Sequence, residues 1–208
     1  MPEPTTEESM STHMQSNPVQ QLSLYAAAAA TCADRYAKAF YPMIKDADEK
    51  MVCCVHGAED MDHYITAAEV LRGLGVDLGG LVERPISERG LQGADVLETT
   101  VSWAERAAFS ALFEGALLAQ LRELARSDCA PIARMAGAAI VREERHVAHG
   151  LGLLRTACGA ADSKAQAQDA VRRIWPVALA VLGAGEPRQA FAGATRDALG
   201  ALGLSVSE

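Results

Sequence analysis

Apolar residues recur at intervals of three and four along most of the chain, which is the spacing of amphipathic α-helices. No segment shows the strict alternation that predicts a β-strand. Pro and Gly residues interrupt the periodicity and indicate where helices begin and end. The pattern predicts six helices: 19–41, 48–74, 94–127, 131–158, one from 162 onward with an interruption near Trp175 and Pro176, and 186–202. The predicted fold is all-α, a four-helix bundle with two additional C-terminal helices.

Two segments lack this periodicity. Residues 1–18 are rich in Pro, Thr, Ser and Glu, and we expect a disordered N-terminal tail ahead of one helical domain over 19–208. Residues 75–94 hold five Gly and one Pro among charged residues, which predicts a long connection with little regular structure. Such a connection is typically a crossover between non-adjacent helices or part of a site, so we expect Gly75 to Gly93 to face a substrate.

The fourth predicted helix carries a carboxylate and an imidazole on its apolar face. Glu143 and His146 are three residues apart and therefore lie on nearly the same side of the helix. The apolar residues on that side are Ile132, Met135, Ala139, Gly150, Leu153 and Leu154. Burying a polar group without a partner costs about 2–7 kcal/mol, so a partner is implied. The pair either satisfies itself or holds a metal, as inward-facing Glu-x-x-His motifs do in di-iron bundles.

The second predicted helix repeats the arrangement with Asp60 and His63, which also share an apolar face. His56 lies one turn earlier on that face, so it is a candidate for an extra ligand or for a hydrogen-bond donor behind one. Glu59 is about 100° away around the helix, and we expect it at the edge of the face.

The third predicted helix places Glu114 on the apolar stripe that runs from Trp103 to Ala125. Glu105 points the opposite way on the same helical wheel and should be exposed to solvent. Three helices would thus bring acids into one core, two of them with a histidine, which favours a metal site over unrelated buried pairs.

Carboxylate and imidazole ligands with open positions suit iron or manganese, and the absence of Cys from the pattern argues against a structural zinc site. The predicted ligands are Asp60, His63, Glu114, Glu143 and His146, with Asp34 and His56 as additional candidates.

Composition and charge limit the classes of binding partner and the cellular compartment that we expect. The chain has 19 basic and 27 acidic residues and a formal charge of −8, which argues against nucleic acid or an anionic membrane. The five cysteines fit no zinc spacing and indicate buried thiols in a reducing compartment. We see no signal peptide and no apolar run of membrane-spanning length, so we expect a cytoplasmic protein.

From Glu49 to the C-terminus, except for a poorly matched linker at 75–100, the chain resembles a known family. It is similar to the ferritin-like subunits of phenylacetyl-CoA epoxidase, the phenylacetate-degradation oxygenase family, and most closely to the catalytic subunit. The similar segments are EKMVCCVHGAEDMDH (49–63), FEGALL (113–118), REERHVAHG (142–150), AQDAVRRIWPVALAVLG (167–183) and RQAFAGATRDALGALGL (188–204). The last segment resembles a C-terminal signature of the family that generic ferritins lack.

The resemblance implies a ligand set. Asp60 and His63 fall on the family's first Glu-x-x-His, Glu114 falls on its third-helix acid, and Glu143 and His146 fall on its second Glu-x-x-His. Ala30 falls where the catalytic subunit has a first-helix Glu. Asp34, one turn later, would replace that ligand, or else the site has three acids instead of four.

Three functions follow from these residues and the resemblance. The first is a non-haem iron oxygenase, holding two iron ions or one, or manganese, that transfers oxygen from O₂ to an organic substrate such as an acyl-CoA. Electrons would come from a separate reductase, since the sequence has no flavin or nicotinamide fingerprint, and we expect a homo- or hetero-oligomer. The second is a metal-poor structural partner subunit of such a complex. The third is a ferroxidase-like or iron-storing protein, and metal content followed by activity with a reductase separates the three.

Overall fold

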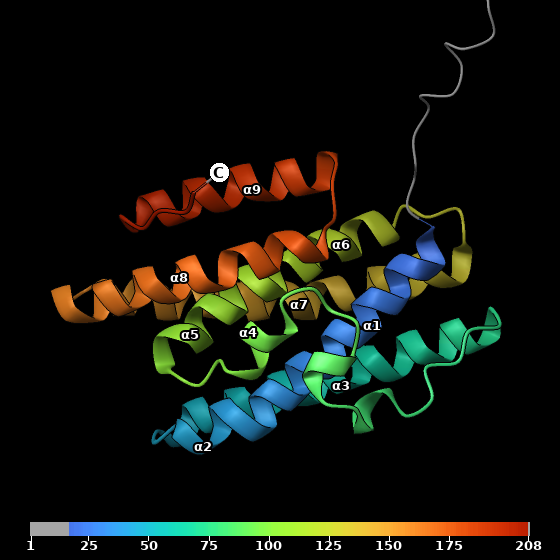
Figure 1. The fold of residues 1–208 in the computed structure, drawn as a ribbon, viewed down its shortest axis with the longest axis horizontal. Helices are drawn as coiled ribbons and strands as arrows, with labels where there is room; N and C mark the ends of the chain where they lie inside the picture. The colour runs from blue at the N-terminus through green and yellow to red at the C-terminus, as the bar shows by residue number, and fades with distance from the viewer. Residues whose placement is uncertain (1–16, 208) are drawn as a thin grey trace, which may run out of the picture.

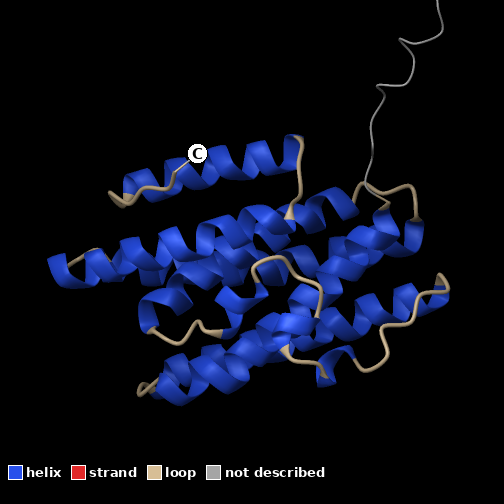
Figure 2. Ribbon diagram, in the orientation of Figure 1, coloured by secondary structure: helices blue, strands red, loops and turns tan. Residues whose placement is uncertain are grey.

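A computed structural model describes residues 17–207, and over these residues the chain is helical with no β-strand (Figure 1, Figure 2). The long helices are α1 (Pro18–Arg35), α3 (Ala47–Gly73), α6 (Glu114–Leu124), α7 (Ala130–Ala157), α8 (Ala161–Val181) and α9 (Glu186–Ala201). The short elements are η1 (Tyr36–Phe40), α2 (Tyr41–Met43), η2 (Leu81–Glu83), η3 (Ile86–Glu88), α4 (Ala94–Glu98), α5 (Trp103–Ala108) and η4 (Phe109–Phe113). Residues 1–16, which make up most of the predicted tail, lie outside the described part.

Four helical legs form the bundle. α1 packs along α3, α6 packs along α7, and α3 contacts α7, which closes the core. α5, η4 and α6 follow one another without a break and together form the third leg. α8 covers α5 and η4, and α9 lies on α6 as the outermost layer beyond α8 (Figure 1). The predicted ferritin-like bundle with two additional C-terminal helices is confirmed.

Two predicted helix boundaries are wrong. The helix predicted from residue 94 breaks after α4, because Ser102 starts a new helix with a reciprocal cap: its hydroxyl accepts from the Glu105 N–H, and the Glu105 carboxylate accepts from the Ser102 N–H. α8 continues through Pro176 without the expected interruption. The 75–93 connection contains only two short 3₁₀ turns, η2 and η3, which agrees with the predicted long connection with little regular structure.

Two π-helical turns, η1 and η4, meet across the core, where the Tyr36 hydroxyl lies 2.7 Å from the Ser110 Oγ. A π-helical turn adds one residue to a helix, so side chains before and after it differ in phase from a regular helical wheel. α7 approaches η4 closely at Gly150, where a Cβ would lie 2.5 Å from the Ala111 nitrogen. Glycine is therefore required at this helix crossing.

All five cysteines are free thiols. Cys32 and Cys53 are buried as predicted, but Cys54 is exposed. Consecutive residues lie about 100° apart around an α-helix, so Cys54 lies outside the buried face of α3 that contains Cys53. Within residues 17–207, no helix combines the length and apolar character that crossing a bilayer requires.

Candidate metal centre

The five residues predicted as metal ligands converge between α3, α6 and α7, and none is more than 3% exposed. The His146 Nδ1 lies 3.6 Å from the Asp60 Oδ1 and 3.8 Å from the Glu114 Oε1. On the other side of the cluster, the His63 Nδ1 lies 3.6 Å from the Glu143 Oε2. These distances are too long for hydrogen bonds, so the side chains face one another without satisfying one another.

Local sequence explains the convergence. In both α3 and α7 an acid and a histidine are three residues apart, so each helix presents the two side chains in the same direction. Glu114 is the first residue of α6, directly after η4, and it turns toward the same point. Gly150 allows α7 to lie against η4, which brings its acid and histidine close to Glu114.

Seven buried polar atoms of the cluster have no hydrogen-bond partner. They are both carboxylate oxygens of Asp60 and of Glu143, the Oε1 of Glu114, the Nε2 of His63 and the Nδ1 of His146. Leaving one such group unpaired costs about 1–3 kcal/mol, so seven in one place point to a ligand that supplies the missing bonds. Carboxylate oxygens and imidazole nitrogens are the donors that a divalent metal ion takes, so the residues present fit a metal.

Electrostatics prepares the imidazoles for this role. Burial lowers the pKa of His63 to about 4 and the pKa of His146 to about 3, so both rings are neutral at pH 7 and each keeps a lone pair. Burial also raises the pKa of Glu114 to about 7, against the hydrogen bonds from Tyr36 and Ser110, which lower it. For Asp60 and Glu143, burial and then the Glu114 charge raise the pKa well above the usual value. A bound cation would remove this penalty on the charged carboxylates.

A second layer of side chains orients the two histidines. The Nε2 of His146 lies 2.9 Å from the Glu59 Oε2, and with the proton on Nε2 the lone pair of Nδ1 faces the cluster. The Tyr25 hydroxyl lies 3.1 Å from the His63 Nδ1. The His56 ring stacks on the His146 ring with 3.9 Å between centroids, and its Nδ1 lies 3.2 Å from the Tyr36 hydroxyl. His56 thus packs against the ring of His146.

Two glutamates have contacts that a helical wheel does not reveal. Glu59 is half-buried at the edge of its helix face, as predicted, and its side chain reaches across to His146 and Arg145 of α7. Glu105 is predicted to face solvent, but it is 9% exposed, caps α5 and pairs with Arg173 of α8. This error has a physical cause, because η4 lies between Glu105 and Glu114 and offsets a regular wheel by one residue.

The first helix contributes differently from expectation. Asp34 does not reach the cluster, because its carboxylate pairs with Lys38 at 2.8 Å and with Arg89. The potential ligand atoms of Cys32, Asp60 and Glu114 lie within 4.8 Å of one another, as do those of Asp60, Glu143 and His146. The structure therefore contains two groups of potential ligands that share Asp60.

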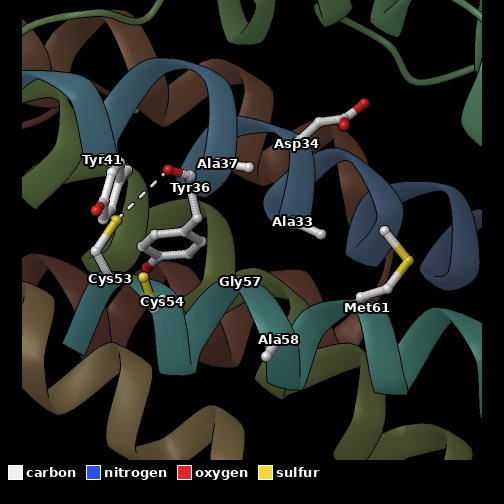
Figure 3. Close-up of a pocket in the computed structure, with 10 residues that line it drawn as sticks. All are labelled: Ala33, Asp34, Tyr36, Ala37, Tyr41, Cys53, Cys54, Gly57, Ala58 and Met61. Atoms are coloured by element: carbon white, nitrogen blue, oxygen red, sulfur yellow. Dashed lines mark hydrogen bonds between the residues drawn. The ribbon is translucent and has the colours of Figure 1, made fainter. Parts of the chain in front are cut away.

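A groove of about 400 Å³ lies beside the cluster, between α1 with η1 on one side and α3 on the other (Figure 3). Its lining residues come from these elements and from α2, and not from the 75–93 connection that we expected to face a substrate. The ring of Tyr36 forms part of the wall, and the hydroxyl of that ring donates to the Glu114 Oε2 at 3.1 Å. Tyr36 therefore separates the groove from the acids. The sequence held a signal for it, since Tyr25 and Tyr36 are 11 residues apart, which is three helical turns.

A family model described as "Phenylacetic acid catabolic protein" matches residues 62–199, about two thirds of the 208 residues. The matched region includes His63, Glu114, Glu143 and His146. No curated protein matches the chain.

Proposed function

The chain belongs to the phenylacetic acid catabolic protein family, and we propose that it is the metal-binding component of an iron-dependent oxygenase. Family membership links the chain to phenylacetate catabolism, and the seven unpartnered atoms of the cluster are the observation that carries the proposal of a metal. The reaction class is transfer of one oxygen atom from O₂ to an organic substrate, with an acyl-CoA as the proposed substrate class. Two electrons and two protons then convert the second oxygen atom to water.

The protein's own residues would bind and shield the metal. Asp60, Glu114 and Glu143 would supply oxygen ligands, and His63 and His146 would supply nitrogen ligands. Iron, when bound, would supply the redox chemistry that O₂ activation needs, and manganese would bind to the same donors. Glu59 would keep the proton on the Nε2 of His146, so that its Nδ1 stays available. The surrounding apolar core would exclude water from the reacting atoms.

Substrate and electrons would reach the site from outside the bundle. The apolar groove along α1 and α3 lies next to Tyr36, and we assign it to the apolar part of the substrate. The sequence carries no flavin or nicotinamide fingerprint, so the electrons would come from a separate reductase in a hetero-oligomeric complex.

The direct test uses protein reconstituted with Fe(II), a suitable reductase and phenylacetyl-CoA under ¹⁸O₂. We expect one ¹⁸O atom in the product for the wild-type protein and none for Glu143→Ala. Iron-loaded wild-type protein that oxidises Fe(II) but leaves the acyl-CoA unchanged would indicate a ferroxidase. A sample that takes up no iron would indicate a structural partner subunit.

A further inference from the structure

We infer that the thiolate of Cys32 is a metal ligand and takes the place of a first-helix carboxylate in this centre. The inference rests on the proposed metal-binding function and deepens it. Cys32 is fully buried, and its sulfur forms one group with carboxylate oxygens of Asp60 and Glu114. Both oxygens of Asp60 and the Oε1 of Glu114 are unpartnered, and both side chains are at least 99% buried. The sulfur therefore lies beside oxygen atoms that already require a ligand.

Helix geometry supports Cys32 over the alternatives on α1. Tyr25, Cys32 and Tyr36 are spaced by seven and four residues, so they share one face of the helix, and both tyrosines contact residues of the centre. Ala30 lies about 160° around the helix from Cys32. It lies instead on the side of Ala33 and Asp34, which line the groove. A carboxylate at position 30 would point away from Asp60 and Glu114.

A second cysteine provides a comparison inside the same protein. Cys53 on α3 is as buried as Cys32, at 1% exposure, but its S–H donates to the backbone carbonyl of Tyr36 at 3.5 Å. It belongs to neither group of potential ligands. Burial alone thus does not place a thiol in the centre, and the position of Cys32 is specific.

Charge also favours the assignment. Three carboxylates, from Asp60, Glu114 and Glu143, and one thiolate carry four negative charges, which balance the four positive charges of two divalent cations. A neutral site is favoured in the buried core, because an uncompensated buried charge is costly. When the cation binds, the thiol proton is released to solvent and the sulfur–metal bond replaces the S–H bond, with no change of oxidation state.

The experiment titrates metal-free protein with Co(II) in the absence of oxygen. Wild-type protein should show a near-ultraviolet thiolate-to-cobalt absorption that develops with binding. Cys32→Ser should abolish this absorption and weaken binding of one Co(II) equivalent at least tenfold. Cys53→Ser and Cys54→Ser, matched buried and exposed controls, should keep both the absorption and the affinity.

Two results overturn the inference, and they have different meanings. Co(II) bound by the wild-type protein with an absorption that Cys32→Ser retains would overturn the role of Cys32 alone. No Co(II) binding by the wild-type protein would overturn the proposed metal-binding function as well. X-ray absorption of the wild-type complex gives an answer that needs no variant to fold: we expect a sulfur neighbour of the metal, and a shell of only oxygen and nitrogen would refute the thiolate.

Discussion

Two buried charged regions lie on opposite sides of α1, and they differ in how their polar atoms are satisfied. Arg89, from the connection between α3 and α4, is 5% exposed and donates to Asp34, to the Thr31 hydroxyl and to the carbonyls of Val82 and Arg84. In the acid and histidine cluster, seven buried atoms have no partner. The first region is complete in the protein alone, whereas the second needs something from outside.

The difference separates a structural role from a binding role. A satisfied network contributes to folding, and its loss leaves charges stranded. An unsatisfied cluster costs stability in the absence of its ligand, so such a cluster indicates that a ligand binds. A change in the Arg89 region should therefore lower stability and leave metal content unchanged. A change in the acid and histidine cluster should lower metal content without lowering the stability of the metal-free protein.

The largest effect should come from Arg89→Met. The variant leaves Asp34 without its buried partner and two carbonyls without a donor, and we expect the free energy of unfolding to fall by about 3 kcal/mol. Urea unfolding of metal-free protein measures this loss. Metal content per folded chain should stay unchanged.

The matched control is Glu143→Met, which removes two unpartnered oxygens from the cluster. We expect metal-free Glu143→Met to be at least as stable as the wild type, because an apolar side chain of similar volume has no such cost. Equal destabilisation by both variants would show that the two regions do not differ.

The next effect concerns the close helix crossing that holds the cluster together. Gly150→Ala would place a methyl group 2.5 Å from the Ala111 nitrogen, so α7 must shift away from η4, at a cost of about 2 kcal/mol. Because the shift moves His146 relative to Glu114, metal affinity should fall as well. Thermal unfolding and metal titration report the two effects separately.

Gly152→Ala serves as the control on the same helix, since nothing lies within 4 Å of its added Cβ. It should stabilise the protein by up to about 1 kcal/mol, because alanine favours helix over glycine. If Gly150→Ala behaved like Gly152→Ala, the close approach would play no part in positioning the centre.

Glu59→Gln should weaken metal binding about tenfold, the lower end of the range for residues that orient a histidine ligand. The amide keeps the size of the side chain but loses the charge that holds the proton on the His146 Nε2. Asp62→Asn is the control, because Asp62 pairs with Arg142 on the exposed surface of the same two helices. Isothermal titration of the two variants with Co(II) should differ, and identical affinities would remove Glu59 from the centre.

The smallest effect is a dependence of metal-free stability on pH. Burial raises the pKa of Glu114 to about 7 from an unfolded value of 4.5, so its contribution is complete below 4.5 and is lost as pH rises through 7. The pKa values of His56, His63 and His146 are lowered, and these histidines act in the opposite direction, because their unfolded forms still bind protons near pH 6.5 and lose them as the pH rises. Between pH 6.5 and 8, Glu114 alone should cost about 1 kcal/mol, and Asp60 and Glu143 act in the same direction.

Urea unfolding at several pH values in this interval measures that slope. Glu114→Gln loses the Glu114 contribution, so its stability should fall less, or rise more, with pH than that of the wild type, while Glu144→Gln, at an exposed residue of α7, should follow the wild type. The same pH dependence in Glu114→Gln and in the wild type would contradict the raised pKa of Glu114.

The sequence was sufficient where helices are regular and one-sided. α3 and α7 are long and uninterrupted, so the three-residue spacing of acid and histidine placed Asp60, His63, Glu143 and His146 correctly in the core. In α7 the contrast between polar and apolar positions indicated the side that faces inward, and in α3 the apolar residues Cys53, Ala67 and Leu71 indicated the side that Asp60 and His63 share.

The sequence was insufficient where a helix has no contrast between polar and apolar sides, or where the regular α-helical repeat is interrupted. In α1 the segment from Ala26 to Ala33 is buried on every side, so periodicity could not indicate which face meets the cluster, and Cys32 was missed. In the third leg, η4 changes the helical phase, which misplaced Glu105. The contact between Glu59 and His146 was missed because a helical wheel does not show how far a long side chain reaches.

The central claim is that the unpartnered cluster binds a metal ion, and anaerobic titration of metal-free protein with Fe(II), with iron content and melting temperature as readouts, tests it most directly. We predict one to two iron atoms per wild-type chain and a melting temperature that rises with Fe(II). His146→Ala should lose most of the iron and most of the rise, because it removes a nitrogen ligand. Asp34→Ala, which alters only the satisfied network, should melt lower but bind as much iron as the wild type. A wild-type protein that binds no iron, or His146→Ala and Asp34→Ala variants that bind equally, would contradict the account.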